Sequence, residues 1–168
     1  MKKRMIPLLL SLSLLCGCAG KPAEKTLTPE ERTQLYQTAI ESARDEETNQ
    51  TVGIITSADD ELAEIVFELL DVKAEDMTAY AMSVSPVNIK AYGVAAIFPA
   101  AGKEDAVRDG LGEFIDRQKE SFQQYLADQY DIAREARLET LEDGTVLLVM
   151  CENQDAVFDS IRDAIEQA

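Results

Sequence analysis

The sequence predicts an α+β fold: an antiparallel sheet of four to five strands built from two strand-strand-helix units, with helices on one face and two further helices at the N-terminus. Two observations support this class. From Met77 the hydrophobic period changes from that of a helix to that of a strand, and the order strand-strand-helix then occurs twice. The two units share no detectable sequence identity, so they are similar only in the order of their elements. Helices with a single apolar stripe are expected to cover one face of such a sheet.

The first N-terminal helix has a start signal with a clear mechanism. Thr28 is the expected N-cap, Pro29 stands in the first turn, and Glu31 completes a capping box. Apolar residues at helical spacing continue to about Arg44, and the polar residues 45–50 then break the pattern. We therefore expect the helix to end near Arg44.

A short connection and a second helix follow. Residues 52–56 are β-prone and fit either a fifth strand at the sheet edge or a simple connection. Ser57 or Asp59 is expected to cap the next helix, whose amphipathic stripe of Leu, Ile and Val ends at Leu70.

Four strands and two helices are predicted beyond this point. Alternation over residues 77–84 is typical of a half-buried strand, and Ser85-Pro86-Val87-Asn88 is turn chemistry. The pattern then predicts, in order, a returning strand over 89–98, a helix over 103–126 that residues 129–136 prolong by a turn or two, a strand over 137–141, a hairpin turn at 142–144, a strand over 145–151 and a last helix capped by Asn153.

Composition excludes several classes of function. The 168 residues include 32 Asp and Glu but 16 Lys and Arg, giving a formal charge of −16, and no His. Nucleic-acid binding needs a basic face that displaces counterions, so no nucleic acid partner is expected. Without His the chain cannot form a Ser-His-Asp triad, a Cys-His pair or a His-ligated zinc or haem site. The sequence predicts no cofactor and no metal site.

Two further patterns have simple structural interpretations. Gly110-Leu111-Gly112 lies within the predicted long helix and follows no βαβ strand, so it favours close packing or a kink over phosphate binding. The acidic clusters at 45–47 and 59–61 lack the alternating ligands and central Gly of an EF-hand loop and are interpreted as a solvated link and a helix cap. Weak calcium binding at these clusters stays open.

The first residues have the pattern of an export signal with a lipid-attachment site. Residues 2–4 are basic, residues 5–15 are an apolar stretch too short to span a bilayer, and Leu15-Cys16-Gly17-Cys18 follows. This segment resembles a bacterial lipobox, which implies diacylglyceryl transfer to the Cys18 sulfur and cleavage after Gly17. Cys16 is the alternative, but Leu15 then stands where a small residue is expected. An ordinary secreted protein is the other alternative.

The domain organisation follows from that processing. Residues 1–17 form the signal peptide, residues 18–28 a lipid-anchored tether, and residues 29–168 a single domain. Cys151 is then the one remaining thiol, so the fold gains no intramolecular disulfide. Cys151 ends an apolar run and is expected to act as a small buried hydrophobe, because no His is present to generate its thiolate.

Two segments, residues 81–93 and 118–130, resemble a family of small bacterial lipoproteins known only as a domain of unknown function. The most specific motif is Tyr125-Leu126-x-Asp128-Gln129-Tyr130, and the resemblance spans Leu62 to Ile165. The family often has Pro where this chain has Ala127, so the helix is expected to run on here. The resemblance implies an exported, lipid-anchored α+β domain, and it supplies no activity and no catalytic residues.

The same segments supply the candidate interaction surface. Tyr125 and Tyr130 carry apolar rings with a polar tip, and they are predicted to line a groove beside the turn that contains Ser85 and Asn88. The alternative is that the two tyrosines fasten the helix end to the sheet.

Three classes of function are weighed. The leading hypothesis is a non-enzymatic interaction or binding domain at the outer face of the cell membrane, anchored through lipid on Cys18 and contacting an unknown protein partner of the cell envelope. A small-ligand-binding lipoprotein is the alternative, although the domain's size leaves little room for a pocket. A His-independent enzyme that uses carboxylates, or Lys90 and Tyr92, is the third, and nothing in the sequence supports it positively.

Overall fold

The computed structural model describes residues 27–87 and 89–168. The predicted signal peptide, Cys18 and most of the predicted tether lie outside these residues. In chain order the elements are α1 (Pro29–Ala43), α2 (Glu46–Thr51), α3 (Ala63–Leu70), a 3₁₀ turn (Ala74–Asp76), β1 (Met77–Val84), β2 (Gly93–Pro99), α4 (Glu104–Phe122), α5 (Ala127–Arg134), β3 (Arg137–Thr140), β4 (Val146–Met150) and α6 (Gln154–Glu166).

The strands form one antiparallel sheet in the order β1-β2-β4-β3. The register places Met82 opposite Ala95, Ala95 opposite Leu148, and Leu148 opposite Leu138. The α+β class and the four antiparallel strands are therefore confirmed. The β-prone segment 52–56 contributes a single bridge, in which Ile55 and Met82 exchange backbone hydrogen bonds of 2.7 and 3.0 Å.

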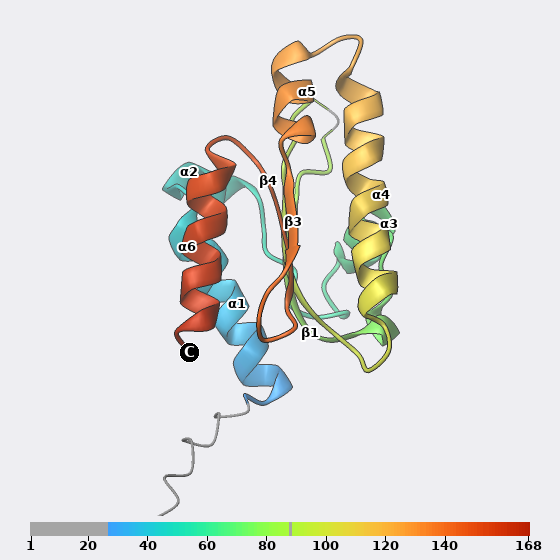
Figure 1. Cartoon of the computed structure of the whole chain (residues 1–168). Coiled ribbons are helices and arrows are strands. Elements are labelled where there is room, and N and C mark those ends of the chain that lie inside the picture. The colour runs from blue at the N-terminus through green and yellow to red at the C-terminus, as the bar shows by residue number, and fades with distance from the viewer. Residues whose placement is uncertain (1–26, 88) are drawn as a thin grey trace, which may run out of the picture.

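Helices cover both faces of the sheet, so the prediction that they lie on one face is wrong (Figure 1). We call the face covered by α3, α4 and α5 the α4 face, and the face covered by α1 and α6 the α1 face. In β4 the side chains alternate between the two: Leu148 and Met150 join the core of the α4 face, and Leu147 and Val149 join that of the α1 face. Both sides of the strand are buried because each side meets a helical layer.

Strand β1 shows why the sequence predicted one open face. Met82 and Val84 point into the α4 face, whereas Ala79 and Ala81 point to the α1 face. From this alternation the sequence predicted that one side of the strand faces the core and the other faces solvent. The small side chains are 0–2% exposed, however, because they let α1 lie close against the strand.

The helix boundaries confirm some predictions and correct others. The capping box of α1 is present: Glu31 N–H donates to Thr28 Oγ1 over 3.2 Å, and Thr28 N–H donates to the Glu31 carboxylate over 2.9 Å. Helix α4 ends at Phe122, and α5 is a separate helix rather than a continuation. Asn153 precedes α6 in the left-handed conformation, but its side chain makes no capping hydrogen bond.

The two predicted N-terminal helices are joined by a third. Residues 46–51 form α2, which buries none of its residues and therefore has no apolar stripe that a periodicity search could find. Asp45 caps this helix. Neither Ser57 nor Asp59 caps α3; Leu62 holds its N-cap position and makes no side-chain cap.

Gly110 lets α4 approach the end of α3. A Cβ at this position would lie 2.2 Å from the carbonyl oxygen of Asp71, the left-handed residue that ends α3. Nothing lies within 4 Å of a Cβ built at Gly112. Close packing is therefore confirmed for Gly110 alone, and its partner is the end of α3 rather than the sheet that the sequence predicted.

Candidate functional site

The predicted interaction surface is divided by the structure. Tyr125 is 84% exposed between α4 and α5, whereas Tyr130 is half-buried against the core of the α4 face. Ser85 is half-buried at the start of the loop that joins β1 to β2, and Asn88 lies outside the described residues. The loop and α5 do meet, because the Ala91 N–H donates to Gln129 Oε1 over 2.8 Å.

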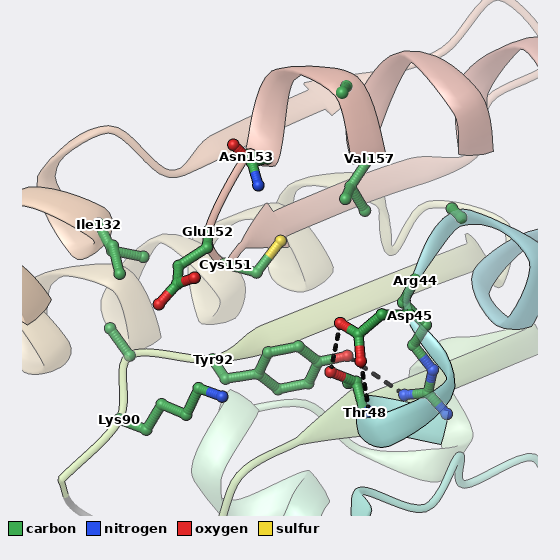
Figure 2. A pocket seen from close by; sticks show the side chains of 13 residues that line it. Arg44, Asp45, Thr48, Lys90, Tyr92, Ile132, Cys151, Glu152, Asn153 and Val157 are labelled. Atoms are coloured by element: carbon green, nitrogen blue, oxygen red, sulfur yellow. Dashed lines mark hydrogen bonds between the residues drawn. The ribbon is translucent and has the colours of Figure 1, made fainter. Parts of the chain in front are cut away.

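A cavity of about 310 Å³ lies where this loop meets the α1 face. Figure 2 shows its side chains, which come from the end of α1, from α2, from the loop before β2, from α5 and from the segment between β4 and α6. The lining residues are Ala43, Arg44, Asp45, Thr48, Lys90, Ala91, Tyr92, Ile132, Cys151, Glu152, Asn153, Ala156 and Val157. The volume lies at the lower end of the range found for small-molecule sites.

Arg44 closes one side of the cavity in a fixed position. Its Nη1 donates to Ser83 Oγ over 2.6 Å and to Tyr92 Oη over 3.2 Å, and its Nε donates to Asn49 Oδ1 over 2.5 Å. These bonds join the end of α1 to the sheet. Because its guanidinium is already hydrogen-bonded within the fold, Arg44 mainly shapes the side of the cavity.

Asp45 is likewise held in place, beside Arg44. Its carboxylate accepts hydrogen bonds of 2.8 and 2.9 Å from the backbone N–H and the hydroxyl of Thr48. The backbone bond, followed by the hydroxyl bond, lowers the pKa of Asp45, so this carboxylate stays ionised.

Cys151 lies among the charged groups of the cavity and is 9% exposed. Burial, with smaller contributions from the negative charges of Glu152 and Asp45, raises the pKa of the thiol to about 11, while Lys90 acts in the opposite direction. The thiol is therefore protonated at neutral pH, where it packs as a small apolar group.

Lys90 and Glu152 are the charged groups that the fold leaves available. Both are exposed and line the cavity from different segments, and Figure 2 shows both side chains at its mouth. Among residues 27–87 and 89–168, neither has a salt bridge or a side-chain hydrogen bond. Lys90 and Glu152 thus present to the cavity one cation and one anion that are not hydrogen-bonded within the described fold, whereas the charges of Arg44 and Asp45 are held by hydrogen bonds to neutral groups.

An acidic hollow adjoins this cavity along α5 and the start of α6. It has a volume of about 790 Å³, and it adds the acidic side chains of Asp131, Glu135 and Asp155 to the Glu152 that both spaces share. Within the part of the chain that the structure describes, no three acidic or cysteine side chains are close enough together to hold a metal ion. Helices long and apolar enough to cross a membrane are also absent from the described residues.

Sequence reasoning did not find this cavity. From the sequence, Lys90 and Tyr92 were named only as part of an enzyme hypothesis, and Cys151 was named only as a core residue. The lining comes from segments more than a hundred residues apart, and none of them carries a ligand motif. The one usable signal in the sequence was Lys90, an isolated charged residue just before a strand, and many protein surfaces share this pattern.

The fold and the cavity define a class: a single antiparallel sheet between two helical layers, with a small charged cavity at one end of the α1 face. Residues 56–151, more than half of the chain, match the family model described as Domain of unknown function (DUF4358). The chain therefore belongs to this family. No curated protein and no solved structure matches it.

Proposed function

We propose that the protein is a lipoprotein anchored at the extracytoplasmic face of the cell membrane, where its folded part acts as a non-enzymatic binding domain. The observation that carries the proposal is the sequence Leu15-Cys16-Gly17-Cys18 after a short apolar stretch with a basic start. Lipid on Cys18 supplies the anchor, since each buried CH₂ contributes about 0.8 kcal/mol of membrane affinity.

The position of the cavity suits a domain held in this way. Figure 1 shows the start of α1, which follows the proposed tether, at one end of the molecule, and α2, α5 and the start of α6 at the opposite end. The cavity is lined from these last elements. An anchor at the N-terminus would therefore leave the cavity facing away from the bilayer. The formal charge of −16 also opposes contact with anionic lipid.

The chemistry of the cavity favours binding over catalysis. Its thiol, Cys151, has a pKa raised to about 11 by burial and is protonated at neutral pH. The chain has no His to act as a general base beside it. Arg44 and Asp45 are held by bonds that stabilise the fold.

A protein partner of the cell envelope is the first candidate for what the domain binds. The exposed apolar side chains of Val87, Ile89 and Tyr125, which are 54, 70 and 84% exposed, support a protein contact at the loops beside α5. A small ligand is the second candidate, and the observation that favours it is the cavity itself.

Cys18→Ser tests the anchor in a host that processes lipoproteins. The wild-type protein should fractionate with membranes and carry the added lipid mass, whereas the variant should appear in the soluble or unprocessed fraction. Cys16→Ser is the matched control and should behave like wild type. A Cys18→Ser protein that keeps both the membrane fraction and the lipid mass would refute the proposal.

Crosslinking at the native membrane, followed by mass spectrometry, tests the binding role. A partner should be lost from the Tyr125→Ala variant but kept by Glu61→Gln, an exposed substitution elsewhere. Equal crosslinking by both variants would place the contact away from these loops.

A further inference from the structure

We propose that the cavity between α2, α5 and the start of α6 binds a small zwitterion of the apolar α-amino acid class, with Lys90 contacting its carboxylate and Glu152 its ammonium group. The inference rests on the proposed binding function and names the ligand class for one site within it. Three observations support it: charge, shape and lining.

The two charged side chains that the fold leaves without hydrogen bonds match a ligand that carries one charge of each sign. Lys90 and Glu152 come from the loop before β2 and from the end of β4, and both line the same cavity. Six of the eleven Lys and Arg side chains among the described residues form salt bridges. Lys90 has no carboxylate within salt-bridge distance among the described residues, although Asp45 and Glu152 line the cavity with it. Its ammonium group is therefore available to a carboxylate from outside.

Part of the remaining lining is apolar. Ala43, Ile132, Ala156 and Val157 line the cavity together with Tyr92, which is 6% exposed and is fixed by the Arg44 bond to its hydroxyl. These side chains can contact the aliphatic side chain of a ligand, while Arg44 and Asp45 are already hydrogen-bonded within the fold. A space of about 310 Å³ has room for one amino acid but not for a folded partner.

Calorimetric titration of the full chain in detergent tests the proposal with three matched probes. L-Leucine carries both charges. Leucinamide keeps the ammonium group and stands for the N-terminus of a peptide, whereas N-acetylleucine keeps the carboxylate and stands for a C-terminus. Leucine should bind at least about tenfold more tightly than either, which corresponds to about 1.4 kcal/mol.

Two variants assign the charges. Lys90→Gln should weaken leucine binding about tenfold or more and leave leucinamide unchanged, and Glu152→Gln should weaken leucine and leave N-acetylleucine unchanged. Lys90→Arg should retain most of the affinity. Lys73→Gln and Glu61→Gln remove exposed charges elsewhere, so they should bind leucine like wild type. Circular dichroism and the Tm verify that each variant is folded, as their exposed positions predict.

Several results would overturn the assignment. An absence of saturable leucine binding refutes it, and so does equal binding of leucinamide or N-acetylleucine, which would show a peptide terminus. Leucine affinity that survives both Lys90→Gln and Glu152→Gln would place the ligand elsewhere. Membrane fractionation of the same cells reports the anchor separately, so an anchored protein that binds no leucine refutes this ligand class alone.

Discussion

The two faces of the sheet are closed by different means. On the α4 face the core is apolar, with large side chains such as Phe114 and Leu111 buried and with backbone contact at Gly110. The polar contacts on this face include bonds to the backbone, such as that from Arg117 to the Leu69 carbonyl. On the α1 face, smaller strand residues lie under α1 and α6, and polar groups hold the helices at the rim. Arg32 stacks on Phe98 at 4.0 Å, and Arg137 stacks on Phe158 at 3.7 Å.

A buried hydrogen-bonded network distinguishes the α1 face further. The hydroxyl of Tyr36, a fully buried residue, lies 2.5 Å from Thr145 Oγ1, and Thr145 in turn donates to Asp143 over 2.9 Å. Arg32 forms a salt bridge with Asp143 and donates to Tyr36. Since such bonds depend on geometry, this face orients its helices as well as burying area.

The family match separates the same two regions. Residues 56–151 include the whole sheet and the helices of the α4 face, whereas α1, α2 and α6 lie outside the matched range. The cavity takes Lys90 and Tyr92 from within the range and Arg44 and Glu152 from outside it. The shape of the cavity therefore depends on how α1, α2 and α6 pack against the sheet.

Gly110→Ala should give the largest effect, because it places a side chain where α4 meets the backbone at the end of α3. The new Cβ would lie 2.2 Å from the Asp71 carbonyl, so the variant should lose about 1 to 3 kcal/mol of unfolding free energy in urea. Gly112→Ala is the control in the same helix; it meets no atom within 4 Å and should gain up to about 1 kcal/mol. If both substitutions change the unfolding free energy in the same direction, the close approach of α4 to the end of α3 is contradicted.

Tyr130→Ala should cost about 1 to 2 kcal/mol, because its half-buried ring packs on the core of the α4 face. Tyr125→Ala, at 84% exposure, should change stability by less than about 0.5 kcal/mol. Thermal melts of the pair measure this difference. If Tyr130→Ala melts like wild type, the ring is free for recognition rather than packing.

Tyr36→Phe should cost about 1 kcal/mol, because it removes the bonds of the buried hydroxyl to Thr145 and Arg32 on the α1 face. Urea denaturation measures it. The ring and its packing remain, and Thr145 keeps its bond to Asp143. A cost near zero would mean that apolar packing alone orients α1, and the two faces would then be alike in their energetics.

Ionisation of Cys151 should have the smallest effect at neutral pH, and its effect on stability appears only as the pH rises. Burial raises its pKa from 9.0 to about 11, so the folded state keeps a proton that the unfolded state loses. The resulting stabilisation is complete below pH 9.0 and is lost as pH rises to about 11. Wild type should therefore lose more stability than Cys151→Ala over this interval. Identical pH profiles would show that the thiol is solvated.

The sequence predicted most of the elements and missed how they are layered. Thr28 and Glu31 define the start of α1 through bonds within three residues of each other, and Gly144, at φ +90°, defines the turn between β3 and β4. The second helical layer was missed because the run Val146–Met150, buried throughout, was not taken as evidence for two covered faces. Helix α2 was missed because caps and polar contacts stabilise it.

The sequence by itself determined the α+β class, the strand pairings of the two hairpins, the strongly acidic charge, and the lipid-attachment pattern that underlies the proposed anchor. These features depend on residues that are close along the chain. Only the tertiary structure decided that helices cover both faces and that Lys90 and Glu152 line one cavity. Such contacts join segments far apart in sequence, and packing, rather than any local preference, sets where they meet.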